Sequence, residues 1–380
     1  MDHAATTPLH PAVTEAMLPF LRERFGNPSS VYTEGREVRK AVEEARGKAA
    51  RAIGADPTEV FFTSGGTEAD NLALLGVARA LRDRGDHVIT TAVEHHAVLE
   101  PCHFLEKEGY RVTYLPVDGT GMVDPEEVRR AITTATVLVS VMHANNEVGT
   151  IQPVEEISAV CREAGVYFHS DAVQTMGALE VDVERLGVDL LSVSAHKIYG
   201  PKGVGCLYVR RDVEIEGILL GGGQERGMRS GTENVAGIVG FGVAMELAAA
   251  EWQERSGRVR PLRDRLVEGI LEGIPHVRLN GHPTRRLPNN ANFLFSYIEG
   301  EAICLRLDFL GVAASTGSAC SSERGEASHV LLSLGIPPEE AHGSLRLTLG
   351  RDNTMEDVEY FLENIPKVGE DLRAMSPLYP

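Results

Sequence analysis

The fold is decided by the stretch Val188-Asp189-Leu190-Leu191-Ser192-Val193-Ser194-Ala195-His196-Lys197, in which an apolar run ends in polar residues. The run Gly165-Val166-Tyr167-Phe168-His169-Ser170 precedes it in the chain and ends in Asp171-Ala172-Val173-Gln174. Short apolar runs of this kind are typical of buried strands. In an α/β sheet, residues just past the strand ends line the ligand crevice. The sequence therefore predicts that Asp171 and Lys197 face one ligand site.

Strand and helix patterns alternate on both sides of this stretch. Five further short β-rich runs are predicted in the first two thirds of the chain, at Val60–Thr63, His87–Thr91, Arg111–Leu115, Thr136–Val141 and Gly205–Val209. Amphipathic helical stretches lie between several of them, for example Glu34–Ile53, Thr67–Arg84 and Val154–Ala164. Such alternation predicts an α/β fold with a mostly parallel sheet covered on both faces.

A long helical zone, about Glu233 to Gly273, leads into a second unit. That unit has predicted strands at Ala291–Phe295 and Ser344–Thr348 and predicted helices at Glu301–Leu310 and Met355–Gly369. We expect a large domain over residues 12–255 and a small domain made of residues 1–11 and 256–380, with a cleft between them. The length of 380 residues is sufficient for two such domains.

A carboxylate and an amine at adjacent strand ends suit pyridoxal 5'-phosphate. Lys197 would form an imine with the cofactor aldehyde, and Asp171 would keep the pyridine nitrogen protonated so that the ring acts as an electron sink. The alternative is a surface lysine and a strand-end cap, but His196, Ser194 and the motifs below favour the cofactor.

The segment Ser64-Gly65-Gly66-Thr67-Glu68 is the candidate for the phosphate end of that site. It follows a predicted strand and opens a predicted helix. Glycines let the backbone approach an anion, and the helix N-terminus offers free N–H groups. Neither a Walker loop nor a dinucleotide fingerprint is present, and such a turn can also simply cap a helix. Gln174, Ser194 and His196 could complete the phosphate cradle.

Three further candidates follow other predicted strands or lie within one. His95 or His96, after the strand His87–Thr91, could lie against a pyridine ring and shuttle protons, and the residues themselves do not decide which. Asn145 is a candidate donor to the cofactor or to a substrate carboxylate. Arg346 lies between apolar residues in Ser344–Thr348, where a bidentate substrate carboxylate or a structural salt bridge would satisfy it.

Composition narrows the partners. The net charge of −18 disfavours binding to nucleic acid or to an anionic membrane. We see no apolar run of membrane-spanning length and no targeting pattern. Five cysteines without a C-x-x-C pair fit a reducing cytoplasm, and the histidines and cysteines lack the spacing of a metal site.

Cys320 stands apart from the other cysteines. It lies in Ala313-Ala314-Ser315-Thr316-Gly317-Ser318-Ala319-Cys320-Ser321-Ser322, where small residues dominate. We expect such a segment to be an exposed loop and its thiol to be reactive once ionised, although an inert loop cysteine is the alternative. Beside a pyridoxal phosphate site, a nucleophilic thiol indicates sulfur chemistry.

Taken together in order, these motifs resemble the cysteine desulfurases of the NifS/IscS type, which are class-V aminotransferases with the aspartate-aminotransferase-like fold type I. The resemblance covers nearly the whole chain. The motifs that carry it, besides those quoted above, are Asp2-His3-Ala4-Ala5-Thr6-Thr7-Pro8, Phe25-Gly26-Asn27-Pro28-Ser29-Ser30, Asn145-Asn146-Glu147-Val148-Gly149-Thr150, Ile198-Tyr199-Gly200-Pro201-Lys202-Gly203 and Met228-Arg229-Ser230-Gly231-Thr232. The resemblance implies a large domain with a mostly parallel seven-stranded sheet and a smaller α+β domain.

The resemblance also implies a role for each matching residue. Lys197 would carry the cofactor, Asp171 would pair with the ring nitrogen, and His95 rather than His96 would stack on the ring. The remaining implied cofactor contacts are Gly66, Thr67, Ser194 and His196 at the phosphate, Gln174 at the phenolic oxygen, and Thr232 at the phosphate of the partner subunit in a homodimer. The implied substrate-carboxylate set is Asn27, Asn145 and Arg346.

The implied reaction converts L-cysteine to L-alanine and leaves a persulfide on Cys320. Sulfur would then pass to a scaffold protein or another acceptor for iron–sulfur cluster assembly or tRNA thiolation. With a scaffold, Cys320 could transiently ligate the cluster; no resident metal is expected. The ending Ser376-Pro377-Leu378-Tyr379 resembles the tail that meets such a scaffold. The alternative activity is that of a selenocysteine lyase, which uses the same cofactor and a similar loop.

Overall fold

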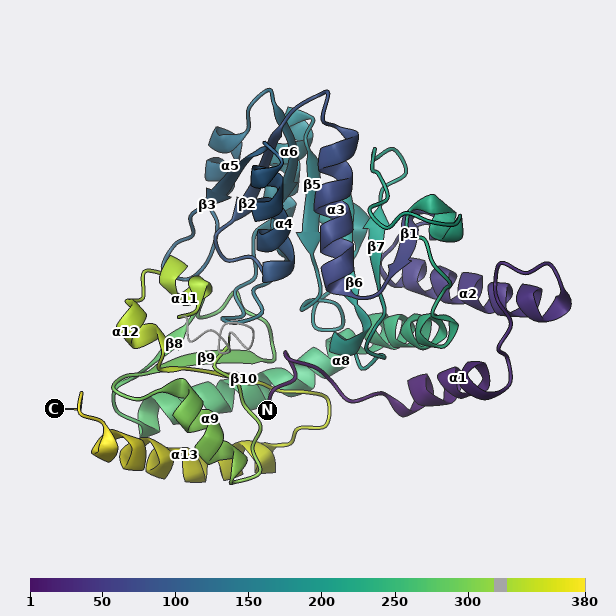
Figure 1. The fold of residues 1–380 in the computed structure, drawn as a ribbon. Coiled ribbons are helices and arrows are strands. Elements are labelled where there is room, and N and C mark those ends of the chain that lie inside the picture. The colour runs from purple at the N-terminus through teal and green to yellow at the C-terminus, as the bar shows by residue number, and fades with distance from the viewer. Residues whose placement is uncertain (318–326, 380) are drawn as a thin grey trace.

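The structure, a computed structural model, describes residues 1–317 and 327–379 and contains two sheets. The larger has seven strands in the order β1-β7-β6-β5-β4-β2-β3 (Figure 1). They are β1 (Val60–Thr63), β2 (His87–Thr91), β3 (Arg111–Leu115), β4 (Thr136–Ser140), β5 (Tyr167–Asp171), β6 (Leu190–Ser194) and β7 (Gly205–Val209). Strands β2 to β6 pair in parallel, and β7 pairs antiparallel with β1 and β6. The predicted mostly parallel seven-stranded α/β sheet is confirmed.

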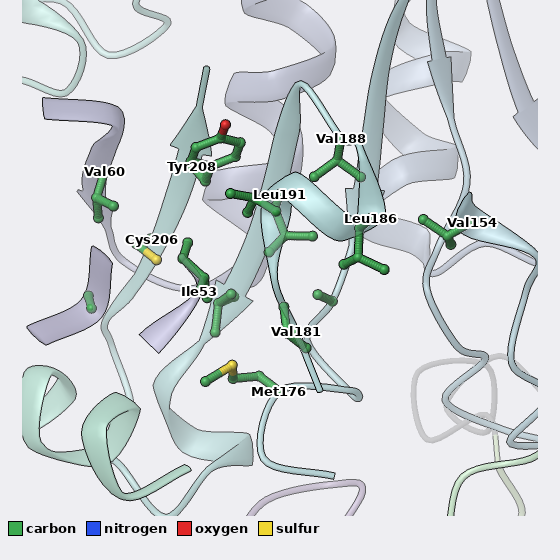
Figure 2. Packing of buried hydrophobic residues seen from close by; sticks show 14 of the residues in the cluster. Ile53, Val60, Val154, Met176, Val181, Leu186, Val188, Leu191, Cys206 and Tyr208 are labelled. Carbon is green, nitrogen blue, oxygen red and sulfur yellow. The ribbon is translucent and has the colours of Figure 1, made fainter. Parts of the chain in front are cut away.

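Helices cover both faces of this sheet because its strands are apolar on both sides. Helices α3 (Gly66–Ala80) and α4 (His96–Lys107) pack on one face. The other face carries α2 (Thr33–Ala52), α5 (Pro125–Ala131), α6 (Val154–Ala164), α7 (Val183–Leu186) and the first part of α8 (Val235–Gly273). Figure 2 shows part of the core on this face, which includes Ile53, Leu191 and Met176. Helix α1 (Pro11–Arg22) packs on α8.

The smaller sheet is antiparallel, in the order β10-β9-β8. Its strands are β8 (Val277–Asn280), β9 (Asn290–Phe295) and β10 (Ser344–Thr348). Strand β8 is not predicted by the sequence, because its four residues alternate apolar and polar over too short a run. The second part of α8, α9 (Gly300–Asp308) and α13 (Met355–Met375) pack with this sheet. The short helices α11 (His329–Ser333) and α12 (Pro338–Ala341) lie between the small sheet and the large one (Figure 1).

Helix α8 links the two units. Residues up to Ala248 belong to the core on the large sheet, and residues from Val259 belong to the core on the small sheet. The predicted boundary at 255/256 falls within this helix and stays a prediction.

The expectation that no apolar run reaches membrane-spanning length is wrong. A window of α8 is long and apolar enough to cross a membrane by length and composition, and 50% of that window is buried inside the protein. A core helix gives the same pattern, so one such helix is weak evidence of a span.

The parallel strands bring the predicted site residues to the carboxyl ends of the strands, which together form one edge of the large sheet. Strand β5 ends at Asp171, β6 ends at Ser194, and a 3-10 turn, η2 (Ala195–Lys197), follows β6 directly. The N-terminal segment approaches this edge from the small sheet, because His3 N–H donates to the Thr348 carbonyl of β10 at 3.2 Å and Thr7 N–H donates to the His196 carbonyl at 3.0 Å. The edge of the large sheet and strand β10 therefore face one another.

Candidate active site

A cavity of about 280 Å³ lies between the carboxyl edge of the large sheet and β10. Nine of the residues expected from the sequence to form the site line it together. They are Gly66, Thr67, His95, Asp171, Gln174, Ser194, His196, Lys197 and Arg346. They come from six elements or loops of the large sheet and from β10, so the fold gathers them although they are spread over most of the chain.

Lys197 and Asp171 both line the cavity. The Lys197 Nζ donates to the backbone carbonyls of Ala4 and Ala5, the latter at 2.9 Å. The Asp171 Oδ1 accepts the Val173 N–H at 2.8 Å. Burial raises the pKa of Asp171 to about 6, and the Val173 N–H and the Lys197 charge limit the rise. A cation beside Asp171 would stabilise its ionised form further.

The predicted phosphate end of the site lies at the start of α3. Gly65 is the N-cap with φ at 155°, a conformation that L side chains rarely adopt, and α3 begins at Gly66. A Cβ on Gly66 would lie 2.8 Å from the Val173 Cγ2, so the close approach of the two loops requires glycine. The first amides of a helix have no acceptor within it, so those of Gly66 and Thr67 are suited to an anion.

His95 caps α4 and lines the cavity as well. Its Nδ1 accepts the Ala97 N–H at 3.1 Å, which places the ring proton on Nε2. Burial, with a smaller contribution from the Lys197 charge, lowers the pKa of His95 to about 4, so the ring is neutral at neutral pH. His96 also lines the cavity, with its ring 4.9 Å from that of His329. The structure thus brings both histidines to the site.

Arg346 is held from several sides. Its Nη1 donates to the Asn146 carbonyl at 3.0 Å and to the Gly317 carbonyl at 3.3 Å, and its Nη2 lies 3.0 Å from Asp2 Oδ1. The side chain is 4% exposed. The guanidinium therefore forms a structural salt bridge, which was one of the two interpretations. It also lines the cavity, and its binding of a substrate carboxylate stays a prediction.

The structure places Asn145 outside the cavity that most of the other predicted residues line. Its Nδ2 donates to the Val93 carbonyl at 2.8 Å, and its Oδ1 accepts the N–H groups of Glu147 and Val148 at 2.9 Å each. The amide thus folds the loop and does not line the cavity, whereas the adjacent Asn146 does. Neighbouring asparagines in a loop point in different directions, and the sequence could not tell them apart.

Three other predicted residues lie outside this cavity or outside the described part of the chain. Asn27 is exposed in the loop between α1 and α2, where its Oδ1 accepts the Ser29 N–H. Thr232 is exposed and lines a separate hollow with Ser64 and Arg229. Cys320 lies outside the described residues.

The cavity is also lined by residues that were not predicted from the sequence. Asp70, on α3, is 1% exposed, and burial raises its pKa well above the ordinary value, with the Asp171 charge adding to the rise. Its spacing of three from Thr67 puts both on one helix face, a signal that was available in the sequence. Glu147 and His329 also line the cavity, but no spacing pattern connects them to the other motifs.

Comparison with known proteins agrees with this geometry. Residues 1–361 match the family model described as aminotransferase class-V. A relative from Dictyoglomus turgidum, described as cysteine desulfurase IscS, is 56% identical over 99% of this chain and 96% of its own length. Another of the same description, from Methanosarcina thermophila, is 56% identical over 100% of this chain and 94% of its own length. The chain belongs to the cysteine desulfurases of the class-V aminotransferase family.

Solved structures of cysteine desulfurases and related proteins share the fold. A structure described as a NifS-like protein superposes with a TM-score of 0.91 at 41% identity, covering 98% of this chain and 99% of that one. A structure described as SspA in complex with cysteine superposes with a TM-score of 0.82 at 35% identity, covering 93% of this chain and 99% of that one. The predicted fold type I architecture is confirmed by these neighbours.

Cysteine desulfurases use pyridoxal 5'-phosphate, and the cavity fits it. The cofactor needs an amine for its aldehyde, a carboxylate for its ring nitrogen and amide donors for its phosphate. Lys197, Asp171 and the start of α3 supply these groups around one cavity. The buried Asp171, with its raised pKa, is also a site where a cationic ring nitrogen would supply the missing countercharge.

Proposed function

We propose that this chain is a pyridoxal phosphate-dependent cysteine desulfurase that converts L-cysteine to L-alanine and collects the sulfur as a persulfide on Cys320. The observation that carries the proposal is the single cavity that holds Lys197, Asp171, His95 and Arg346, in a chain 56% identical over its length to cysteine desulfurases. The relatives' descriptions do not favour the alternative, a selenocysteine lyase.

Each residue of the cavity has a role that follows from its position. When bound, pyridoxal phosphate supplies an electron sink for the carbon skeleton of the substrate. Lys197 Nζ would hold the aldehyde carbon and, once released by the substrate amine, accept the proton from the substrate Cα. Asp171 would keep a proton on the ring nitrogen, and Gly66 and Thr67 would bind the phosphate.

His95 and Arg346 would orient the reacting molecules. The neutral His95 ring, with its proton on Nε2, would lie against the cofactor ring and donate from Nε2 (Nδ1 is occupied by the helix cap). Arg346 would bind the substrate carboxylate by charge-assisted hydrogen bonds. Asn146, not Asn145, would then be the asparagine that contacts the ligand.

The transfer of sulfur from L-cysteine to Cys320 needs no further oxidant or reductant, because the thiol sulfur is oxidised while the substrate carbon is reduced. The thiolate of Cys320 attacks the sulfur of L-cysteine, an S–S bond forms, and the C–S bond of the substrate breaks with its electron pair left on carbon. A proton then completes L-alanine, and Cys320 keeps the sulfur as a persulfide. An iron–sulfur scaffold protein or another acceptor would receive that sulfur.

We also propose that the enzyme is a homodimer that works in the cytoplasm. Thr232 is exposed and lines a hollow separate from the cavity of its own chain, which suits a contact with the phosphate bound by the partner subunit. The same arrangement would explain why Asn27 does not line the cavity of its own chain. Light scattering measures the mass in solution, and a monomer that retains full activity would contradict this arrangement.

Mass spectrometry after incubation with L-cysteine tests the function. We expect the peptide that contains Cys320 to gain the mass of one sulfur atom, with L-alanine released in equal amount. The variant Cys320→Ala should bind the cofactor normally and form no adduct. Persulfide on another cysteine, or L-alanine release at the wild-type rate by this variant in the presence of an acceptor, would contradict the assignment of the nucleophile.

A further inference from the structure

The carboxylate of Asp2 is paired with Arg346, the residue to which the proposed function assigns the carboxylate of the substrate. Its Oδ1 lies 3.0 Å from the Nη2 of Arg346, and the two side chains are 21% and 4% exposed. The backbone fixes this pair, because Asp2 forms a parallel bridge with Thr348 on the same strand as Arg346. The Thr348 N–H donates to the Met1 carbonyl at 2.8 Å, and the Ala4 N–H donates to the Thr348 Oγ1 at 2.8 Å. The carboxylate is therefore held at the guanidinium by ordered main chain.

The remaining donors of Arg346 show where a ligand would bind. Both contacts of Nη1 go to backbone carbonyls, those of Asn146 and Gly317. The Nε is buried and has no hydrogen-bond partner among the residues that the structure describes. A carboxylate that binds the side edge of a guanidinium uses Nε and Nη2 together. An incoming carboxylate would thus meet Asp2 at Nη2.

We propose that Asp2 is a specificity-determining residue whose carboxylate shares Arg346 with the carboxylate of the substrate and thereby sets the affinity for it. The inference rests on the proposed function for the identity of the substrate. Without a ligand, Asp2 supplies the counter-ion that a buried guanidinium requires. With a ligand, two anions face one cation, and their repulsion weakens substrate binding. A ligand without a carboxylate avoids this competition.

The same N-terminal segment contacts the other cation of the site. The carbonyls of Ala4 and Ala5 accept from Lys197 Nζ, two and three residues after Asp2. One ordered segment therefore holds a carboxylate at Arg346 and carbonyls at Lys197, so the charge at position 2 can be changed while the main-chain contacts to the lysine remain.

The substitution Asp2→Asn isolates the charge. Asparagine keeps an oxygen acceptor for Nη2 and removes the negative charge. We expect the KM for L-cysteine and the dissociation constant of the product L-alanine, read from the cofactor absorbance of the holoenzyme, to fall by about tenfold. Binding of cysteamine and ethylamine, which lack the carboxylate, should stay unchanged. The matched control is Asp352→Asn, because Asp352 is an exposed carboxylate paired with Arg351 at 3.1 Å, outside the cavity, and its removal should change neither ligand class.

Several results would overturn the proposal. An unchanged or raised dissociation constant for L-alanine in the folded Asp2→Asn holoenzyme would show that Asp2 only supports structure. An equal change for alanine and ethylamine would show that the effect does not act through the carboxylate. If the wild-type enzyme fails to turn over L-cysteine, the proposed function fails, and the comparison of alanine with ethylamine still decides the role of Asp2.

Discussion

The buried ion pair between Arg46 and Glu225 holds the turn that precedes Thr232, and its contribution to the free energy of unfolding can be tested. Arg46 on α2 lies 2.7 Å from Glu225 Oε2 through Nη1 and 2.8 Å from Oε1 through Nη2. The side chains are 5% and 3% exposed, and Glu225 also accepts the Phe62 N–H at 2.8 Å. Glu225 lies in the turn η3 (Gln224–Gly227) with φ at 46°, so the pair fastens an unfavourable backbone that leads to Thr232.

We expect Glu225→Gln to lower the free energy of unfolding by about 3 kcal/mol. Removing one partner of a buried pair costs roughly 3–5 kcal/mol because the other charge stays buried. The lower end applies here, because Glu43 lies 3.1 Å from the Arg46 Nε and keeps part of the countercharge. Glu246→Gln is the matched control, because Glu246 on α8 pairs with Lys48, which lies on α2 as Arg46 does. The side chains of Glu246 and Lys48 are 52% and 32% exposed, and an exposed pair contributes at most about 1 kcal/mol.

Urea unfolding followed by the fluorescence of Trp252 on α8 measures both variants. The double variant Arg46→Met, Glu225→Gln removes the uncompensated charge and should recover part of the lost stability. Equal losses in Glu225→Gln and Glu246→Gln, or a double variant that recovers none of the stability lost in Glu225→Gln, would refute the reasoning.

Two further predictions concern Glu94, which is buried next to the cavity residue His95 in the chain, and Arg346, which lines the cavity. Burial raises the pKa of Glu94 to about 8; such a group stabilises the fold fully below its unfolded pKa of about 4.5 and loses that stabilisation as pH rises through about 8. Glu94→Gln should therefore flatten the fall in melting temperature from about pH 5 to about pH 8, and an unchanged slope would assign the fall to other groups. Arg346→Ala should raise the KM for L-cysteine by roughly tenfold to a hundredfold, the loss of a charge-assisted contact of about 1.5–3 kcal/mol, while cysteamine binding stays the same. A normal KM for L-cysteine in steady-state kinetics would leave Arg346 with its salt bridge to Asp2 alone.

The sequence predicted the large sheet and the position of Lys197 and Asp171 because local patterns encode both. Apolar runs with the strand period mark β5 and β6, and the parallel topology then brings their ends together. The order of glycines before α3 marked the phosphate end in the same way. None of these inferences required knowledge of contacts between distant segments.

Other features depend on tertiary contacts that no local pattern reveals. Asn145 and Asn146 are alike in sequence, and the contacts of Asn145 with Val93 and Val148 decide which one lines the cavity. The contact of Asp2 with Arg346 joins the N-terminal segment to β10, which lies 344 residues further along the chain. Strand β8 is recognisable only once β9 lies beside it.

Chemical reduction of the holoenzyme tests the central claim most directly. Borohydride fixes a cofactor imine to the lysine that bears it, and peptide mass spectrometry then locates the adduct. We predict a pyridoxyl phosphate adduct on Lys197, absent from Lys197→Ala together with the absorbance of the bound cofactor. An adduct on Lys202 or another lysine, or no adduct in a protein saturated with pyridoxal phosphate, would contradict the account.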